Sequence, residues 1–197
     1  MKLFGHRHSV RLKKYDYSDA GWYFVTICTK DMECLFGDTI NDQIILNEFG
    51  NIIQQYWLII QKHFNIVELD DYVIMPNHIH GIIVIRNQKP FVGAGFPRPL
   101  STLGQIIGYF KYQSTKQINI LVKGSGNPTP TKQHIIKQIF QRSFYDHVIR
   151  TEQDLFRIRQ YIRDNPKNWD EDENNLKSKG GETTWILNNS QHSQNLN

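Results

Sequence analysis

Short runs of apolar residues, rich in aromatic and β-branched side chains, predict β-strands in parts of the chain. The aromatic and β-branched run at 21–29 predicts a strand, and the run at 139–150 predicts another. Residues 71–86 predict a β-hairpin, because two apolar runs flank Pro76 and Asn77. Proline presets φ and asparagine tolerates tight turns, so this pair favours a reversal of the chain.

Other apolar residues recur every three or four positions, which predicts amphipathic helices. Three stretches have this helical spacing: 47–64, 101 to about 119, and 151 to about 165. Ser101 is a candidate cap for the second helix, and Thr151 with Asp154 resembles a capping box that opens the third. Pro166 disfavours helical geometry at Asn165, so we expect the third helix to end there.

Loops and polar segments divide the chain into a predicted domain and a tail. We expect one domain over 1–169, with a basic arm at 1–16 and a Gly/Pro-rich insertion at 87–100. A second Gly/Pro-containing loop is expected at 123–132. From 170 to 197 the chain is acidic and then polar, which predicts a lightly docked or flexible tail.

Composition adds weak constraints. A net charge of +4 and an isoelectric point near 9.0 favour an anionic partner. Cys28 and Cys34 form neither a CxxC pair nor a disulfide framework, so a reducing cytoplasm is the expected location. No apolar run has the length of a membrane span, and there is no P-loop, so nucleotide hydrolysis is not indicated.

The candidate chemistry begins with His78 and His80, two positions apart on the second strand of the predicted hairpin. A strand has a period of two, so both imidazoles face the same side while Ile79 faces away. Such a pair can chelate a metal ion. The alternative is two polar residues at a strand edge, and the pair needs a partner to exclude it.

Partners for the histidines are available on the last predicted helix. Tyr161 and Asn165 are four residues apart, so the phenol and the amide share one face. An amide oxygen with two imidazoles, and with positions left open, suits a hard divalent ion such as Mg²⁺ or Mn²⁺. Such an ion polarises a phosphodiester, and Tyr161 could then attack phosphorus. A free phenol has a pKa near ~10, so the nucleophile needs help.

These motifs resemble a known family. Tyr72-Val-Ile-Met-Pro-Asn-His-Ile-His80 is similar to the His-hydrophobic-His (HUH) motif of single-tyrosine transposases, and in particular of the REP-associated tyrosine transposases. Three other stretches are similar to the same family: 11–17 with 23–28, Ser143-Phe-Tyr-Asp-His-Val-Ile-Arg150, and Tyr161-Ile-Arg-Asp-Asn-Pro166. The resemblance covers about residues 7 to 169.

The resemblance implies an α+β fold of the ferredoxin-like HUH type, in which helices pack on an antiparallel sheet. It also implies that His78, His80 and Asn165 bind Mg²⁺ or Mn²⁺ and that Tyr161 is the nucleophile. The implied substrate is single-stranded DNA with imperfect hairpins, cleaved to a 5′-phosphotyrosine and a free 3′-OH. The expected enzyme is a monomer or a homodimer, and no membrane partner is expected.

Candidate DNA contacts are cationic residues in three parts of the chain: Arg11, Lys13 and Lys14, then Arg142, then Arg157 and Arg163. Such residues also commonly do no more than solvate a surface. Single-strand binding would combine these charges with exposed aromatic residues such as Tyr109 or Tyr112.

Two other functions stay open from the sequence. The chain could be a domesticated protein that binds DNA hairpins without cutting them. It could also be a metal-dependent phosphodiesterase that activates water and forms no covalent intermediate.

Overall fold

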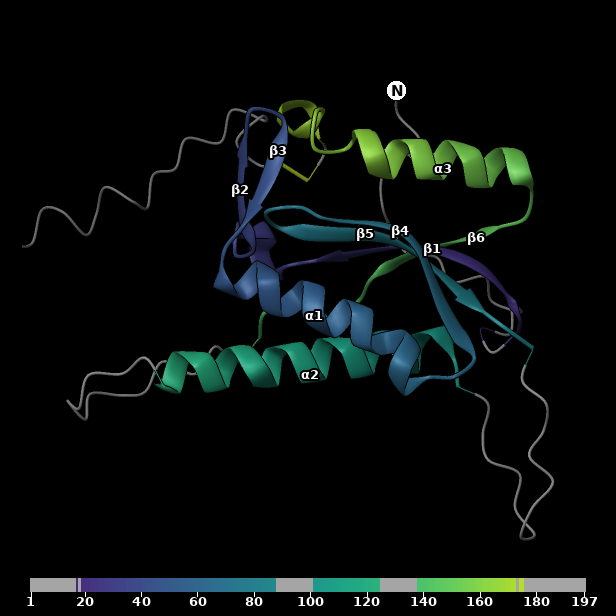
Figure 1. Ribbon diagram of the computed structural model, residues 1–197, viewed down its shortest axis with the longest axis horizontal. Helices are drawn as coiled ribbons and strands as arrows, with labels where there is room; N and C mark the ends of the chain where they lie inside the picture. Colours follow the sequence, from purple (N-terminus) through teal and green to yellow (C-terminus); the bar gives the residue numbers. More distant parts are fainter. Residues whose placement is uncertain (1–16, 18, 88–100, 125–137, 173, 176–197) are drawn as a thin grey trace, which may run out of the picture.

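The central feature of the structure is a four-stranded antiparallel sheet with helices on both faces (Figure 1). The structure is a computed structural model, and it describes residues 17, 19–87, 101–124, 138–172 and 174–175. The predicted arm 1–16, the loop segments 88–100 and 125–132, and residues 176–197 of the predicted tail lie outside the described residues.

The strand order of the sheet is β4-β5-β1-β6, where the strands are β1 (Gly21–Cys28), β4 (Val67–Ile74), β5 (His78–Ile85) and β6 (Tyr145–Ile149). Every neighbouring pair is antiparallel. With helix α1 between β1 and β4, and helix α2 between β5 and β6, this is the βαββαβ order of a ferredoxin-like domain. The predicted α+β fold class is confirmed.

Two helices, α1 (Glu48–His63) and α2 (Leu103–Gly124), cover one face of the sheet, and α3 (Glu152–Asp164) covers the other (Figure 1). The chain also forms a separate hairpin of β2 (Gly37–Ile40) and β3 (Gln43–Leu46) and two short 3₁₀ turns, η1 (Lys30–Met32) and η2 (Trp169–Glu171). Within the described residues, no helix combines the length and apolar character needed to cross a membrane.

Strand alternation divides the core into two layers. Alternate residues of β1 and β5, such as Tyr23 and Ile79, belong to the large core with α1 and α2. The intervening residues, such as Phe24 and Ile82, pack with Ile158 and Ile162 of α3 in a smaller core. All eight residues of β5 are therefore buried, and both histidines on this strand are fully covered.

Most of the predicted elements are present, with shifted boundaries. Thr102, not Ser101, caps α2, because its hydroxyl accepts from the Gln105 amide while the Gln105 side chain accepts from the Thr102 amide. This helix continues to Gly124, so the loop predicted from 123 begins later. Of the strand predicted at 139–150, only β6 (Tyr145–Ile149) is a regular strand. Before it, Phe140 makes an isolated bridge to Thr29.

The first described residues of the tail predicted from 170 include buried side chains. Asp172, Asn174 and Asn175 are buried, and Trp169 is 8% exposed, so this segment is packed on the domain. Polar side chains are usually solvated, which is why composition suggested a tail. Here they are buried because they hydrogen-bond one another and the main chain: Asn175 donates to the Trp169 carbonyl, and Asp172 accepts from the Asn174 amide.

Candidate active site

The two histidines lie at the start of β5, directly after the Pro76-Asn77 turn. Their Nε2 atoms are 3.0 Å apart, and both side chains have no exposed surface. His80 Nδ1 lies 2.9 Å from the hydroxyl of Thr26 on the adjacent strand β1. The Phe24 ring stacks on His80 from the same strand. Two neighbours on β1, Thr26 and Phe24, therefore fix the orientation of the His80 imidazole.

Asn77 determines which nitrogen of His78 carries a hydrogen. Its Nδ2 donates to two carbonyls, those of Met32 and Asn174, so the orientation of the amide is set. The opposite atom, Oδ1, then faces His78 Nδ1 at 2.8 Å and must accept from it. In a neutral imidazole this leaves the lone pair on His78 Nε2, directed at His80.

A cation fits this arrangement of donors. Two nitrogen lone pairs 3.0 Å apart repel each other unless a proton or a metal ion lies between them. Ligands at right angles around an ion, each about 2.1 Å from it, are about 3.0 Å apart. The other ring nitrogen of each histidine is hydrogen-bonded to an oxygen, Asn77 Oδ1 for His78 and Thr26 Oγ1 for His80, and such partners commonly orient metal-binding imidazoles.

One oxygen donor lies close enough to be the third ligand, and a second is hydrogen-bonded to it. A carboxylate oxygen of Asp172 and a ring nitrogen from each of His78 and His80 all lie within 4.8 Å of one another. Asn165, the ligand expected from the sequence, is buried and donates its Nδ2 to Asp172 Oδ2 over 3.2 Å. Its Oδ1 is buried and has no hydrogen-bond partner among the described residues. The third position therefore has an anionic candidate and a neutral one.

The phenol of Tyr161 lies beside the histidine pair. Its oxygen is 3.2 Å from His80 Nε2, and its ring packs edge-on against both His80 and Phe24. Tyr161 is half-buried, which leaves the phenol partly accessible. The nucleophile predicted from the sequence and the two predicted metal ligands thus come together, although they are separated by some eighty residues of chain.

Helix α3 is tied to β4 by two ion pairs on either side of Tyr161. Arg159 binds Asp70 through two hydrogen bonds, of 2.8 and 2.6 Å, and Arg163 Nε lies 2.7 Å from Asp71. The register of β4 shifts between Leu69 and Tyr72, so these two aspartates sit in an irregularity of the strand. The Arg159 guanidinium holds the pKa of Asp70 below its ordinary value.

The cationic residues expected to contact DNA are placed differently from one another. Arg163 pairs with Asp71, and Arg157 pairs with Asp154, so both charges are matched by an acid of the same chain. Arg142 is exposed beside α2, on the opposite side of the sheet from α3. The predicted contacts Arg11, Lys13 and Lys14 lie outside the described residues.

Sequence reasoning missed Asp172, because it follows the last predicted helix in an acidic stretch with no apolar period. Trp169 was the available signal: a large aromatic residue just before that stretch is hard to reconcile with a solvated tail. In the structure its ring centroid lies 6.0 Å from that of His78, and the segment after it brings the carboxylate to the histidines.

Comparison with known proteins places the chain in a family. An uncharacterised protein of Haemophilus influenzae is 39% identical over 178 residues, which cover 85% of this chain and 92% of that protein. The two chains therefore belong to one family. No family model matches the chain.

A solved structure supplies the fold. The REP-associated tyrosine transposase bound to a REP hairpin superimposes with a TM-score of 0.53 and 18% identity, over 81% of this chain and 73% of that one. This chain has the fold of the REP-associated tyrosine transposases. The resemblance seen in the HUH motif is thus confirmed at the level of the fold. A candidate transposase from Deinococcus radiodurans, at 18% identity, covers 78% of this chain and 95% of its own, but its TM-score of 0.40 is too low to support an argument.

Proposed function

We propose that the protein is a transposase-type single-stranded DNA endonuclease that binds hairpin DNA and cuts it through a 5′-phosphotyrosine intermediate. The observation that carries the proposal is the position of the Tyr161 oxygen, 3.2 Å from His80 Nε2, where that nitrogen also meets His78 Nε2. A nucleophile and a pair of metal-binding imidazoles rarely converge at a buried site without a chemical role.

In this reaction the Tyr161 oxygen forms a bond to phosphorus, and the bond from phosphorus to the 3′ oxygen of the preceding nucleotide breaks. The phenol proton leaves to solvent, and the released 3′ oxygen takes up a proton. The ester stores the energy of the broken bond, so a 3′-OH can reseal it without ATP. Joining would be the same exchange in reverse, which accords with the absence of a P-loop.

His78, His80 and an oxygen from Asp172 or Asn165 would hold a divalent ion, and Mn²⁺ or Mg²⁺ is the expected metal. Such an ion, when bound, polarises the phosphodiester and stabilises charge on its oxygens. Asn77 and Thr26 keep the imidazole nitrogens oriented toward it. Phe24 packs against both His80 and Tyr161, so it holds the ligand and the nucleophile in one geometry.

The decisive experiment mixes the full chain with labelled stem-loop DNA bearing single-stranded flanks, with Mn²⁺, Mg²⁺ or EDTA. A denaturing gel then reports covalent adduct and cleavage. We expect an adduct that needs the metal and is lost in Tyr161→Phe, with the rate falling at least ~10³-fold. Tyr145→Phe is the matched control, since this phenol lies on β6 and its ring, like that of Tyr161, packs edge-on against Phe24.

Two outcomes would contradict the proposal. Cleavage that survives Tyr161→Phe would instead indicate a phosphodiesterase that uses metal-activated water. A native-gel shift without cleavage, with either metal and with the wild-type chain, would indicate a hairpin-binding protein that has lost the reaction.

A further inference from the structure

A groove lies on the opposite side of the sheet from Tyr161, between α2 and the segment 138–142. Its volume is about 450 Å³. The described residues that line it are basic, polar or apolar, and none of them is acidic: Lys111, Tyr112, Thr115, Lys116, Asn119, Gln138, Ile139, Phe140, Gln141 and Arg142. A groove with this lining is complementary to an anionic strand.

No acid offsets the positive charge among the described residues that line the groove. Helix α2 contains three lysines and no aspartate or glutamate over its 22 residues. Lys116 and Arg142 are exposed, and among the described residues neither forms an ion pair. Such cations can bind phosphate without first giving up a partner within the protein.

Lys111 holds the two walls of the groove together. Its ammonium donates to the carbonyls of Gln141 and Ser143 and lies over the rings of Phe140 and Phe144. The segment 138–142 is therefore fixed against α2, so the main-chain positions that carry Lys116 and Arg142 are set before any ligand binds. A preformed site loses less entropy when it binds a ligand.

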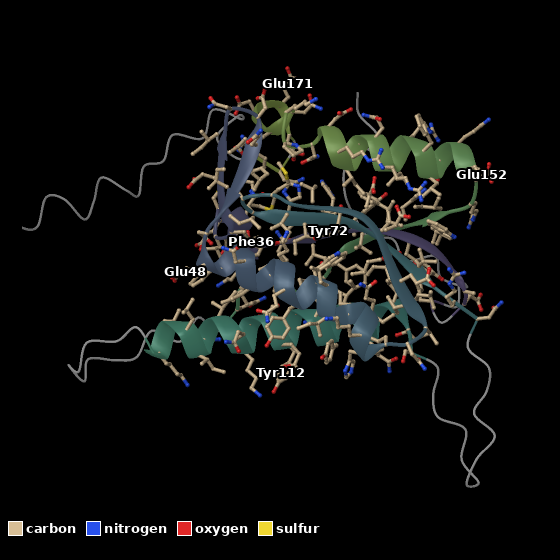
Figure 2. The ribbon with its side chains drawn as sticks, in the orientation of Figure 1. Phe36, Glu48, Tyr72, Tyr112, Glu152 and Glu171 are labelled. Carbon is tan, nitrogen blue, oxygen red and sulfur yellow. The ribbon has the colours of Figure 1, made fainter. Side chains whose placement is uncertain are left out.

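Tyr112 supplies a surface on which a base can stack. Its side chain is 65% exposed and projects from α2 away from the sheet (Figure 2). A positively charged groove next to an exposed aromatic ring is the usual arrangement for binding single strands. A base-paired stem keeps its bases stacked inside the duplex, so a concave groove beside an exposed ring favours the unpaired strand.

The groove is connected to the candidate active site by a short chain of contacts. Gln141, in the groove wall, donates to the Met32 sulfur over 3.4 Å, and the Met32 carbonyl accepts from Asn77. Asn77 in turn binds His78. The wall of the groove thus adjoins the turn that carries the histidine pair, at the end of the sheet where β1 continues to Thr29.

We infer that this groove, which we call the α2 groove, binds the sugar-phosphate backbone of the unpaired DNA strand that flanks the hairpin. This inference rests on the proposed function and adds to it a binding surface separate from the site of cleavage. Lys116 and Arg142 contact phosphates, and Tyr112 stacks on a base. The strand then passes around the edge of the sheet toward the histidine pair.

The test measures binding by fluorescence anisotropy in the full chain with Tyr161→Phe, so that DNA stays intact. The probes are an oligo(dT) strand of about 16 nucleotides, a stem-loop with an unpaired flank, and the same stem-loop with blunt ends. In Lys116→Gln/Arg142→Gln we expect affinity for the first two probes to fall by about 10–30-fold near 0.1 M salt. The slope of log affinity against log salt should decrease by about 1.4, or about 0.7 for each phosphate that the protein no longer neutralises.

Matched variants separate the groove from general charge effects. Arg150→Gln/Lys62→Gln removes two exposed cations elsewhere, and its affinity should stay within about twofold of the parent chain. Tyr112→Phe should keep binding, because stacking is retained, while Tyr112→Ser should lose about 5–50-fold. The blunt stem-loop should bind the groove variants as it binds the parent.

Equal losses in the groove and control variants would overturn the inference, as would unchanged affinity in the groove variants. An equal loss on the blunt stem-loop would assign the groove to the stem instead of the flank and would also overturn it. The proposed function fails separately, if the wild-type chain forms no Tyr161 adduct on any DNA. If the wild-type chain forms the Tyr161 adduct but the groove variant binds DNA as the parent does, the proposed function stands and only the inference about the α2 groove fails.

Discussion

The two faces of the sheet use their cationic side chains in different ways. On α3 all three arginines pair with acids: Arg157 with Asp154, Arg159 with Asp70, and Arg163 with Asp71. Helix α2 has no acid, and its Lys116 forms no ion pair among the described residues. The paired arginines fix the helix that carries Tyr161, whereas the unpaired cations stay available for a ligand. Net charge alone would not distinguish these two uses.

The largest expected effect concerns which chain supplies the nucleophile. Tyr161 lies next to its own His80, and the ion pairs hold α3 on its own sheet. We therefore expect Tyr161→Phe and His80→Ala to be inactive both separately and when mixed, as measured by covalent adduct on a denaturing gel. Adduct in the mixture would mean that α3 reaches the histidines of a neighbouring chain.

The second effect concerns the metal. If the Asp172 carboxylate is the third ligand, Asp172→Ala should weaken Mn²⁺ binding by about 10–100-fold in calorimetry, and Asn165→Ala should weaken it less. Asp170→Ala, an exposed neighbouring acid, is the control. A larger loss in Asn165→Ala than in Asp172→Ala would return the role to the amide oxygen predicted from the sequence.

The third effect is the pH dependence of the unfolding free energy that Lys111 of α2 causes. Burial lowers the pKa of Lys111 to about 8, whereas the unfolded chain keeps an ordinary lysine pKa near 10.5. Between these values the unfolded state binds more protons, so this lysine makes the free energy of unfolding rise with pH. Relative to Lys111→Met, the wild-type chain should gain about 2 kcal/mol of stability between pH 8 and 10. Urea unfolding at several pH values measures the difference in unfolding free energy between the two chains. A difference that does not change with pH would contradict a lowered pKa for Lys111.

The smallest effect concerns the ion pairs of α3. Asp70→Asn should cost about 1 kcal/mol in unfolding free energy, because Arg159 loses a bidentate partner that is only partly exposed. It should also lower the rate of adduct formation by several fold with DNA affinity unchanged, because Tyr161 is less firmly positioned.

The pH dependence and a control sharpen that test. The pKa of Asp70 is lowered by Arg159, so the contribution of the pair is present above the ordinary aspartate pKa near 3.8 and is lost as pH falls through the lowered value. Arg86→Gln removes a more exposed pair, with Glu68, and should leave the rate unchanged. Equal rate effects in Asp70→Asn and Arg86→Gln would argue against a positioning role.

Local sequence determined most of the elements. The period of apolar residues predicted α1, the turn chemistry of Pro76-Asn77 predicted the β4-β5 hairpin, and Thr151 capped α3 as expected. The β2-β3 hairpin was missed, because its turn residues Asn41 and Asp42 adopt positive φ without the glycine that usually marks such a turn.

The sequence by itself also determined that His78 and His80 face one side, since a strand has a period of two, and that Tyr161 shares a helix face with Asn165. Only the tertiary structure decided what these faces meet. The burial of Trp169 brought Asp172 to the histidines, and the irregularity in β4 placed Asp70 and Asp71 against the arginines of α3. Such contacts join residues far apart in the chain, and their energy depends on desolvation and packing that no local pattern encodes.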